Sequence, residues 1–218
     1  MPPQSFASAP PEPAARAAGA LYFVLIGFGM TAQFVLRGPA LALPDSALTA
    51  APLRLSIAFD VAMMAADIAL AVIFFLLLRT VSQGAALTAM VLRLMQAGLI
   101  GASLIALTGA AALVEAQQPA LARQMAAMHA AGYDLGLIFF GGNSLAMAWL
   151  LCRGGAVPRA ITAGIGAAGL VYIAGGFLRL LAPALMPLFE PAYLIALVAE
   201  VALALWLLVT GRIANRAG

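Results

Sequence analysis

One stretch of the chain places residue types that could do chemistry inside a strongly apolar run. It reads His129-Ala-Ala-Gly132-Tyr133-Asp134-Leu-Gly136 and holds the single histidine of the sequence, a carboxylic acid and two glycines four residues apart. On insertion scales a charged side chain at the centre of a membrane helix costs about 2.5–3.5 kcal/mol, so ionisable residues there mark functional sites by default. His129 and Asp134 are therefore candidates for ligand or proton handling. The alternative is that His129 is a hydrogen-bonded strut between helices.

The metal and haem chemistry that His129 could support is limited by the residues available to join it. Asp60 and Asp134 are the only plausible partners in a metal ligand set, whereas a catalytic zinc usually has three protein ligands. A haem would need a methionine as its second axial ligand. The methionines in the apolar runs are more readily explained as packing residues; they are Met63, Met64, Met95 and Met128. We therefore expect no metal site and no cofactor.

A serine hydrolase could be assembled from Ser103, His129 and an aspartate at the same level. The sequence has no Gly-x-Ser-x-Gly turn to present the nucleophile. A serine in a membrane helix is ordinarily a packing residue. We therefore assign no catalytic residue and favour a non-enzymatic role, with an intramembrane hydrolase kept as an alternative.

The composition identifies the class of protein that must position these residues. Of the 218 residues, 65% are hydrophobic and 9% are charged, whereas a soluble domain has about 25% charged residues. This composition fits a polytopic membrane protein. All 11 basic residues are arginine, which excludes a lysine Schiff base and a phosphate-binding loop with its lysine. The single cysteine, Cys152, excludes an internal disulfide.

Six apolar runs predict an all-α protein with six transmembrane helices. Each run reaches the roughly 20 residues that a helix needs to cross a bilayer. We expect a disordered Pro/Ala-rich tail over 1–15, one transmembrane domain over 16–212 and a short basic tail over 213–218. The predicted helices cover about 17–36, 54–78, 86–113, 121–151, 160–181 and 192–210.

Six spans place both termini on one side of the membrane, and arginine positions indicate which side. With the amino terminus inside, six arginines lie at cytoplasmic helix ends and four at outer ends, so the positive-inside rule favours cytoplasmic termini. The inner set is Arg16, Arg79, Arg153, Arg159, Arg212 and Arg216, and the outer set is Arg37, Arg54, Arg123 and Arg179. Trp149, Trp206 and Tyr193 lie near predicted helix ends, where such rings anchor a protein in the interface. The positive net charge needs no nucleic-acid partner.

Two positions in neighbouring antiparallel helices lie at the same depth in the membrane when they are equally far from the turn that joins the helices. Depths assigned in this way place the intramembrane polar residues in two layers. The outer layer places His129 level with residue 107. The mid-membrane layer consists of Asp67, Arg93, Gln96, Asn143 and Glu200, and the outer layer of Asp60, His129, Asp134 and Arg179. The first candidates for ligand or proton handling are Asp67, Arg93, Gln96, His129, Asp134 and Glu200, and the second are Asp60, Asn143 and Arg179.

The mid-membrane layer has two acids for one arginine. A buried carboxyl group without a partner takes up a proton rather than remain charged. We therefore expect one of these acids, Glu200, to be protonated at neutral pH, which makes proton-coupled behaviour possible.

Small residues at helix-contact spacing predict close helix crossings. Gly132 and Gly136 share one face of the fourth helix, and Gly98 pairs with Ala102 in the third. The side chains of His129 and Asp134 point about 140° apart round their helix. Both can face inward only if the fourth helix lies near the centre of the bundle, which we expect. The fifth helix carries Gly164, Gly166, Gly169, Gly175 and Gly176.

Several spaced motifs together resemble one family of membrane proteins. They are Ala15-Arg16-Ala-Ala-Gly19-Ala-Leu21-Tyr22, Arg93-Leu-Met-Gln96-Ala97, His129-x-x-Gly132-Tyr133-x-x-Gly136-Leu-Ile-Phe139-Phe140-Gly141, Val157-Pro158-Arg159, Gly169-x-x-Tyr172 and Glu200-x-x-x-Ala204-Leu205-Trp206-Leu207-Leu208-x-x-Gly211. In this order they resemble the six-helix bacterial membrane proteins catalogued as domain of unknown function 4386. The resemblance covers nearly the whole chain beyond the tail. It implies a six-helix protein of the bacterial inner membrane with no established activity and supplies no catalytic residue.

Three kinds of function remain open. The first is non-enzymatic binding, transport or sensing of a small lipophilic or protonatable ligand by the polar layers. The second is an accessory subunit packed against a larger membrane complex, for which a glycine- and alanine-rich surface on the fifth helix would be evidence. The third is an intramembrane hydrolase. The expected partners are the lipid bilayer and a membrane-complex partner or a second copy of the chain, with no nucleic acid.

Overall fold

The computed structural model describes residues 11–214, and this part of the chain is helical with no strand. The predicted tails fall mostly on residues 1–10 and 215–218, which lie outside the described residues. The first helix, α1, begins at Pro11, so residues 11–15 of the predicted tail belong to it.

Six helical segments are long and apolar enough to cross a membrane, which confirms the predicted fold class. The first segment contains three elements in succession: α1 (Pro11–Met30), the π-helix η1 (Thr31–Arg37) and α2 (Gly38–Ala42). A single 3-10 turn, η2 (Asp45–Ala47), follows it. The sixth contains η3 (Pro183–Leu185), α7 (Met186–Phe189), η4 (Glu190–Ala192) and α8 (Tyr193–Thr210). The other four are α3 (Ala50–Leu78), α4 (Gln83–Glu115), α5 (Pro119–Gly154) and α6 (Arg159–Leu181).

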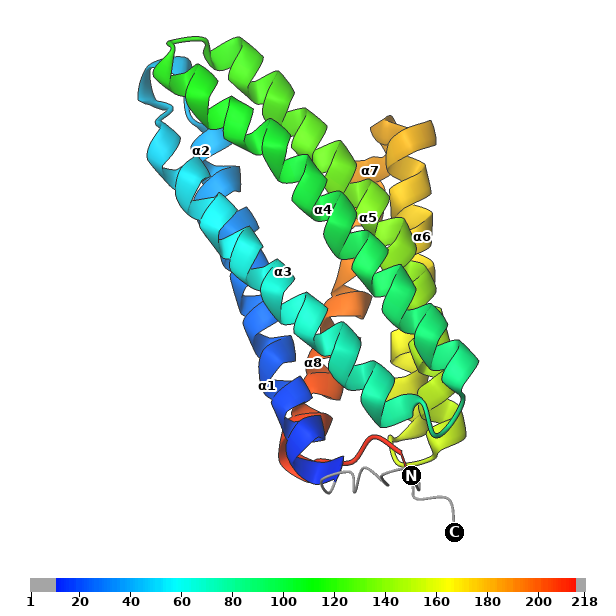
Figure 1. Cartoon of the computed structure of the whole chain (residues 1–218). Helices are drawn as coiled ribbons and strands as arrows, with labels where there is room; N and C mark the ends of the chain where they lie inside the picture. The colour runs from blue at the N-terminus through cyan, green and yellow to red at the C-terminus, as the bar shows by residue number, and fades with distance from the viewer. Residues whose placement is uncertain (1–10, 215–218) are drawn as a thin grey trace.

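The six long helices form a closed ring (Figure 1). Each packs mainly against the helix before it and the helix after it, and α8 closes the ring by packing against both α6 and α1. The expectation that the fourth helix, α5, is central is therefore wrong. Short turns keep successive helices side by side, so α5 lies between α4 and α6. His129 contacts Ser103 of α4, and Asp134 contacts Arg179 of α6.

The turns set the level of each helix against the next. Ser82 caps the start of α4, where its side chain accepts a hydrogen bond from the Ala85 amide at 3.4 Å. Gln117 has a φ of 58° between α4 and α5 and so reverses the chain within a few residues. Gly155 and Gly211 end α5 and α8 with φ values of 68° and 64°, the left-handed conformation that favours glycine at helix ends.

Glycines allow the ring's helices to approach closely. A Cβ added to Gly19 would lie 2.6 Å from the Leu208 amide nitrogen, so α1 and α8 touch through backbone at this point. A Cβ on Gly141 would lie 2.6 Å from the Gly169 carbonyl oxygen, which makes the α5–α6 crossing equally tight. By contrast, nothing lies within 4 Å of a Cβ on Gly98. The predicted contact role of Gly98 is therefore wrong, because this glycine faces away from the neighbouring helices.

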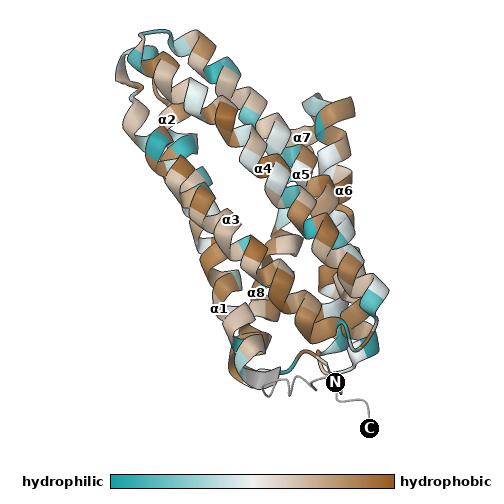
Figure 2. Ribbon diagram, viewed as in Figure 1, coloured by the Kyte–Doolittle hydropathy of each residue, from teal (hydrophilic) through white to brown (hydrophobic). Residues whose placement is uncertain are grey.

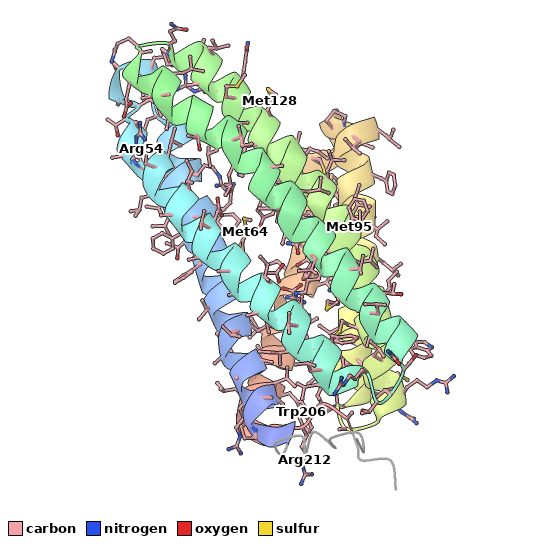
Figure 3. The ribbon with its side chains drawn as sticks, in the orientation of Figure 1. Arg54, Met64, Met95, Met128, Trp206 and Arg212 are labelled. Atoms are coloured by element: carbon pink, nitrogen blue, oxygen red, sulfur yellow. The ribbon has the colours of Figure 1, made fainter. Side chains whose placement is uncertain are left out.

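The surface agrees with a position in the bilayer. Hydrophobic residues predominate along the helices, and hydrophilic residues are most frequent near their ends, with a smaller number in between (Figure 2). Arg54 lies at one end, and Trp206 and Arg212 lie at the other (Figure 3). Trp206 donates a hydrogen bond from Nε1 to the Arg212 carbonyl at 2.9 Å, and the Arg153 guanidinium lies 5.1 Å from the centre of the Trp149 ring. Both tryptophans thus lie at helix ends as predicted.

The end of the ring opposite the start of α1 and the end of α8, called the outer end, is held together by two exposed ion pairs. Arg54 at the start of α3 binds both carboxylate oxygens of Glu115 at the end of α4. Arg123 at the start of α5 pairs with Asp45 and donates to the Leu43 carbonyl at 2.7 Å. These contacts fix the loop after α2 against the α4–α5 turn.

Candidate functional site

The centre of the mid-membrane layer is an ion pair enclosed by aromatic rings. Arg93 of α4 donates from Nε to the Asp67 carboxylate of α3 at 2.7 Å, and each side chain is 2% exposed. The Arg93 guanidinium carbon lies 5.0–5.6 Å from the centres of three rings, those of Tyr22, Phe74 and Phe140. Cation–π attraction of this kind adds to the ion pair when the cation is withdrawn from water. The pair thus ties α3 to α4 and contacts α1 and α5.

The other members of the predicted mid-membrane layer divide around this pair. Asn143 lines the same small gap in the interior as Arg93. Gln96 is buried, and its side-chain oxygen has no hydrogen-bond partner among the described residues. Glu200 of α8 forms no ion pair within residues 11–214, and the Tyr172 hydroxyl of α6 donates to its carboxylate at 2.8 Å.

The outer layer contains two further ion pairs. Arg179 of α6 donates to Asp134 of α5 at 2.7 Å. Asp60 of α3 is 1% exposed and lies 2.6 Å from Arg37, which the sequence placed at the outer helix end. Arg37 is instead 6% exposed and lies inside the first span. The sequence analysis missed this pair, although the apolar residues that follow Arg37 show that the span continues past it.

The π-helix η1 explains the position of Arg37. The Gly38 amide bonds to the Gln33 carbonyl, and a Cβ on Gly38 would lie 2.8 Å from that oxygen. Only glycine fits this wider turn without displacing the backbone. Arg37 also donates from Nε to the Gln33 side chain at 3.0 Å. A π-helical turn inside an α-helix frequently occurs at a functional site, and here it directs Arg37 inward.

His129 contacts a serine instead of an acid. Its Nδ1 lies 2.9 Å from the Ser103 oxygen, which in turn lies 2.7 Å from the Ile100 carbonyl. A hydroxyl has one proton, so both contacts are hydrogen bonds only when Ser103 donates to Ile100 and His129 donates to Ser103. The other ring nitrogen, Nε2, is then an acceptor, and it is buried without a partner in the described part of the chain. Ser103 lies one helical turn from the level predicted for His129.

This arrangement differs from that of a serine hydrolase. In such enzymes Nε2 takes the serine proton and Nδ1 is held by an acid. Here Nδ1 contacts the serine, and the nearest outer-layer acids are bound to Arg37 and Arg179. Within residues 11–214, no group of three or more histidine, cysteine or acidic residues could hold a metal ion.

A cavity of about 500 Å³ lies inside the outer half of the ring. It is lined by α1, η1, α2, α5, α6, η4 and α8, with Met63 as the contribution of α3. Glu200 and Tyr172 are at its inner end, and Glu190 and Arg179 are at its outer end. Arg179 lies seven positions after Tyr172, which gives the cavity a depth of about 10 Å along α6. Its other polar lining residues are Gln33, Arg37, His129, Tyr133, Asp134 and Tyr193.

The predicted site residues thus fall into two groups. His129, Asp134, Arg179 and Glu200 line the cavity, whereas Asp60, Asp67, Arg93, Gln96 and Asn143 lie outside its lining.

The tyrosines of the lining were missed by the sequence analysis. Tyr193 was expected to be an interfacial anchor, but its hydroxyl is buried without a partner in the described residues. It lies 2.1 Å from the position of a Cβ on Gly175. The signal that could have identified these residues is a phenol group within an apolar run, because a buried hydroxyl needs a hydrogen-bond partner.

Comparison with known proteins gives one match. No curated protein and no solved structure matches the chain. The family model described as Domain of unknown function (DUF4386) matches residues 17–211, so the chain belongs to this family.

Proposed function

We propose that the protein binds a small lipophilic or protonatable molecule in the cavity and acts as a carrier or sensor in the bacterial inner membrane. The observation that carries the proposal is the buried carboxyl group of Glu200 at the inner end of a cavity of about 500 Å³. This volume lies within the range of about 300–1,000 Å³ that small-molecule sites occupy. Polar groups aimed into a mainly apolar cavity are the usual means of orienting such a ligand.

The alternatives have less support. A role as an accessory subunit would be favoured by a glycine-rich surface on α6 that packs against no other helix of the chain. Added Cβ atoms on the α6 glycines would instead meet residues of α5 and α8, including Ala148, Ala199 and Gly141. A hydrolase would need a carboxylate hydrogen-bonded to His129. The only side-chain hydrogen bond of His129 in residues 11–214 is to Ser103.

Native mass spectrometry of the protein extracted gently from its own membrane tests this proposal. We expect a bound small molecule at one copy per chain. Ala130 lines the cavity and is exposed to it, so Ala130→Phe should fill part of the cavity and remove the molecule. Ala131→Phe is the matched control, because Ala131 is also exposed and lies outside the lining.

The two other results of this measurement count against the proposal. A protein partner at one-to-one stoichiometry with an empty cavity would make the chain a subunit of a complex. A molecule that both alanine variants retain equally would be bound elsewhere, on the lipid-facing surface.

A further inference from the structure

We propose that the ligand is an amphipathic organic cation whose ammonium head binds Glu200 and whose apolar tail leaves the cavity between η1 and α8. This inference names the ligand class and rests on the proposed binding function. It is carried by the charges around the cavity, by its unpartnered polar atoms and by the chemistry of its rim.

The charges of the cavity lining favour a cation. Arg37 and Arg179 are each bound to an acid, Asp60 and Asp134 respectively, at 2.6 and 2.7 Å. Glu200 is the lining acid at the inner end, and among the described residues its hydrogen-bond partner is the neutral Tyr172 hydroxyl. A buried carboxylate is stable only with a compensating charge. A ligand cation would supply the charge that the chain does not.

The unpartnered atoms around the cavity favour a ligand that donates hydrogen bonds. The hydrogen bond from Tyr172 occupies one carboxylate oxygen of Glu200 and leaves the other free to accept. His129 Nε2 accepts in the tautomer that its contact with Ser103 requires. An ammonium group has three donors and no acceptor. The rings of Tyr172 and Tyr193, with centres 5.9 Å apart, add aromatic surface suited to a cation.

The rim explains where an apolar tail would lie. Phe34 of η1 and Leu194 of α8 both belong to the cavity lining and are 65% and 62% exposed. The helices α1 and α8 touch at Gly19 and Leu208 and separate toward the outer end (Figure 1). The opening between η1 and α8 is therefore edged with apolar side chains that face lipid. A ligand dissolved in the bilayer can enter sideways with its tail still in the hydrocarbon.

Binding of a cation should release a proton. Without a ligand, Glu200 holds its proton, since a buried carboxyl with no cation bound to it is neutral. The incoming ammonium keeps its own protons and becomes the partner of the carboxylate, while the carboxyl proton leaves to water. One cation is thus exchanged for one proton. The charged and titratable groups facing Glu200 from the other helices are Tyr22, Asp67, Arg93, Tyr133 and Tyr172.

Three probes with one apolar body and different heads test this inference: n-decylamine, n-decanol and n-decanoate. Binding is measured with the whole protein in lipid nanodiscs, with empty nanodiscs as the background. We expect saturable binding of decylamine, weakened about tenfold or more by Glu200→Gln, because this change removes one partner of a buried charge pair. Glu115→Gln, at an exposed pair on the outer end, should leave the affinity unchanged. A pH-indicator dye in weak buffer should report one proton released per decylamine, and none in Glu200→Gln.

The outcomes separate this inference from the binding function. Decanol or decanoate binding as tightly as decylamine, and blocked by Ala130→Phe, would overturn the cation while leaving the cavity as a ligand site. Decylamine binding without proton release, or with equal affinity in Glu200→Gln, would also overturn it. If no probe binds above background and no molecule co-purifies with the protein, the binding function itself fails.

Discussion

Arg93 lies between three aromatic rings and one carboxylate in the interior of the ring. Withdrawing both charges from water is costly, and their attraction offsets that cost only while both are present. Arg93 and Asp67 lie outside the cavity lining, so a ligand need not touch them. At the scale of single residues, the pair is best explained as a structural link between α3 and α4.

Replacing Arg93 alone should therefore destabilise the protein strongly. Arg93→Met leaves Asp67 buried without its partner, and we expect a loss of about 3–5 kcal/mol in the free energy of unfolding. Thermal unfolding in detergent, followed by size-exclusion chromatography, measures the effect. Adding Asp67→Asn to the same chain should restore much of the stability, because the orphaned charge is gone.

A control separates the buried pair from arginine replacement in general. Arg54→Met breaks the exposed pair with Glu115 and should cost only about 0–1 kcal/mol. If Arg93→Met were as stable as Arg54→Met, the structural explanation of the buried pair would be wrong.

Sequence reasoning located residue contacts well where a short turn joins the two helices. The membrane depths assigned from the sequence placed Asp67 near Arg93 and Arg179 near Asp134, and these contacts are present. His129 was placed level with residue 107, one turn from its partner Ser103, because backbone levels do not show which neighbour a side chain reaches. The Arg37 contact depends on the π-helix, whose i to i+5 hydrogen bonds change which face Arg37 occupies.

At the scale of elements, the contact between α1 and α8 closes the ring. These helices are the first and last of the chain, so no turn fixes their level and the sequence predicted no contact between them. The crossing is made by backbone, with Gly19 against the Leu208 amide and the Ala204 carbonyl. Six apolar runs predict six helices, but only close approaches of this kind show which helix packs against which. The same closure brings Glu200 of α8 into the cavity.

A methyl group at the crossing should loosen the ring. A Cβ in Gly19→Ala would lie 2.6 Å from backbone that cannot move aside, and overpacking of this kind typically costs about 1–3 kcal/mol. Gly27→Ala, eight residues further along the same helix, is the matched control, because nothing lies within 4 Å of its added Cβ. It should be neutral or slightly stabilising, since alanine favours a helix by about 1 kcal/mol over glycine.

Unfolding temperatures of the two glycine variants decide whether the crossing is as close as described. We expect a lower unfolding temperature for Gly19→Ala than for Gly27→Ala. Equal unfolding temperatures would mean that α1 and α8 do not meet through backbone at Gly19.

At the scale of the whole molecule, the cavity occupies one half of the ring. The start of α1 and the end of α8 lie at the opposite end (Figure 1), and the interior there is filled by the apolar residues around Leu70, Leu150 and Leu203. Under the proposed function, a ligand would exchange with one face of the membrane and its adjoining leaflet. Which face this is depends on the orientation of the chain, which the distribution of arginines predicts with the termini in the cytoplasm.

The single native cysteine offers a direct test of this orientation. Cys152 is exposed near the inner end of α5, beside Arg153. A membrane-impermeant maleimide should leave Cys152 unlabelled in intact spheroplasts and label it in inverted vesicles. In the double variant Cys152→Ser/Ser46→Cys the reactive residue moves to the exposed turn η2 at the outer end, so the labelling pattern should reverse. If Cys152 reacts first in spheroplasts, the chain is inverted. The cavity would then open to the cytoplasm, and a bound cation would exchange for a proton on that side.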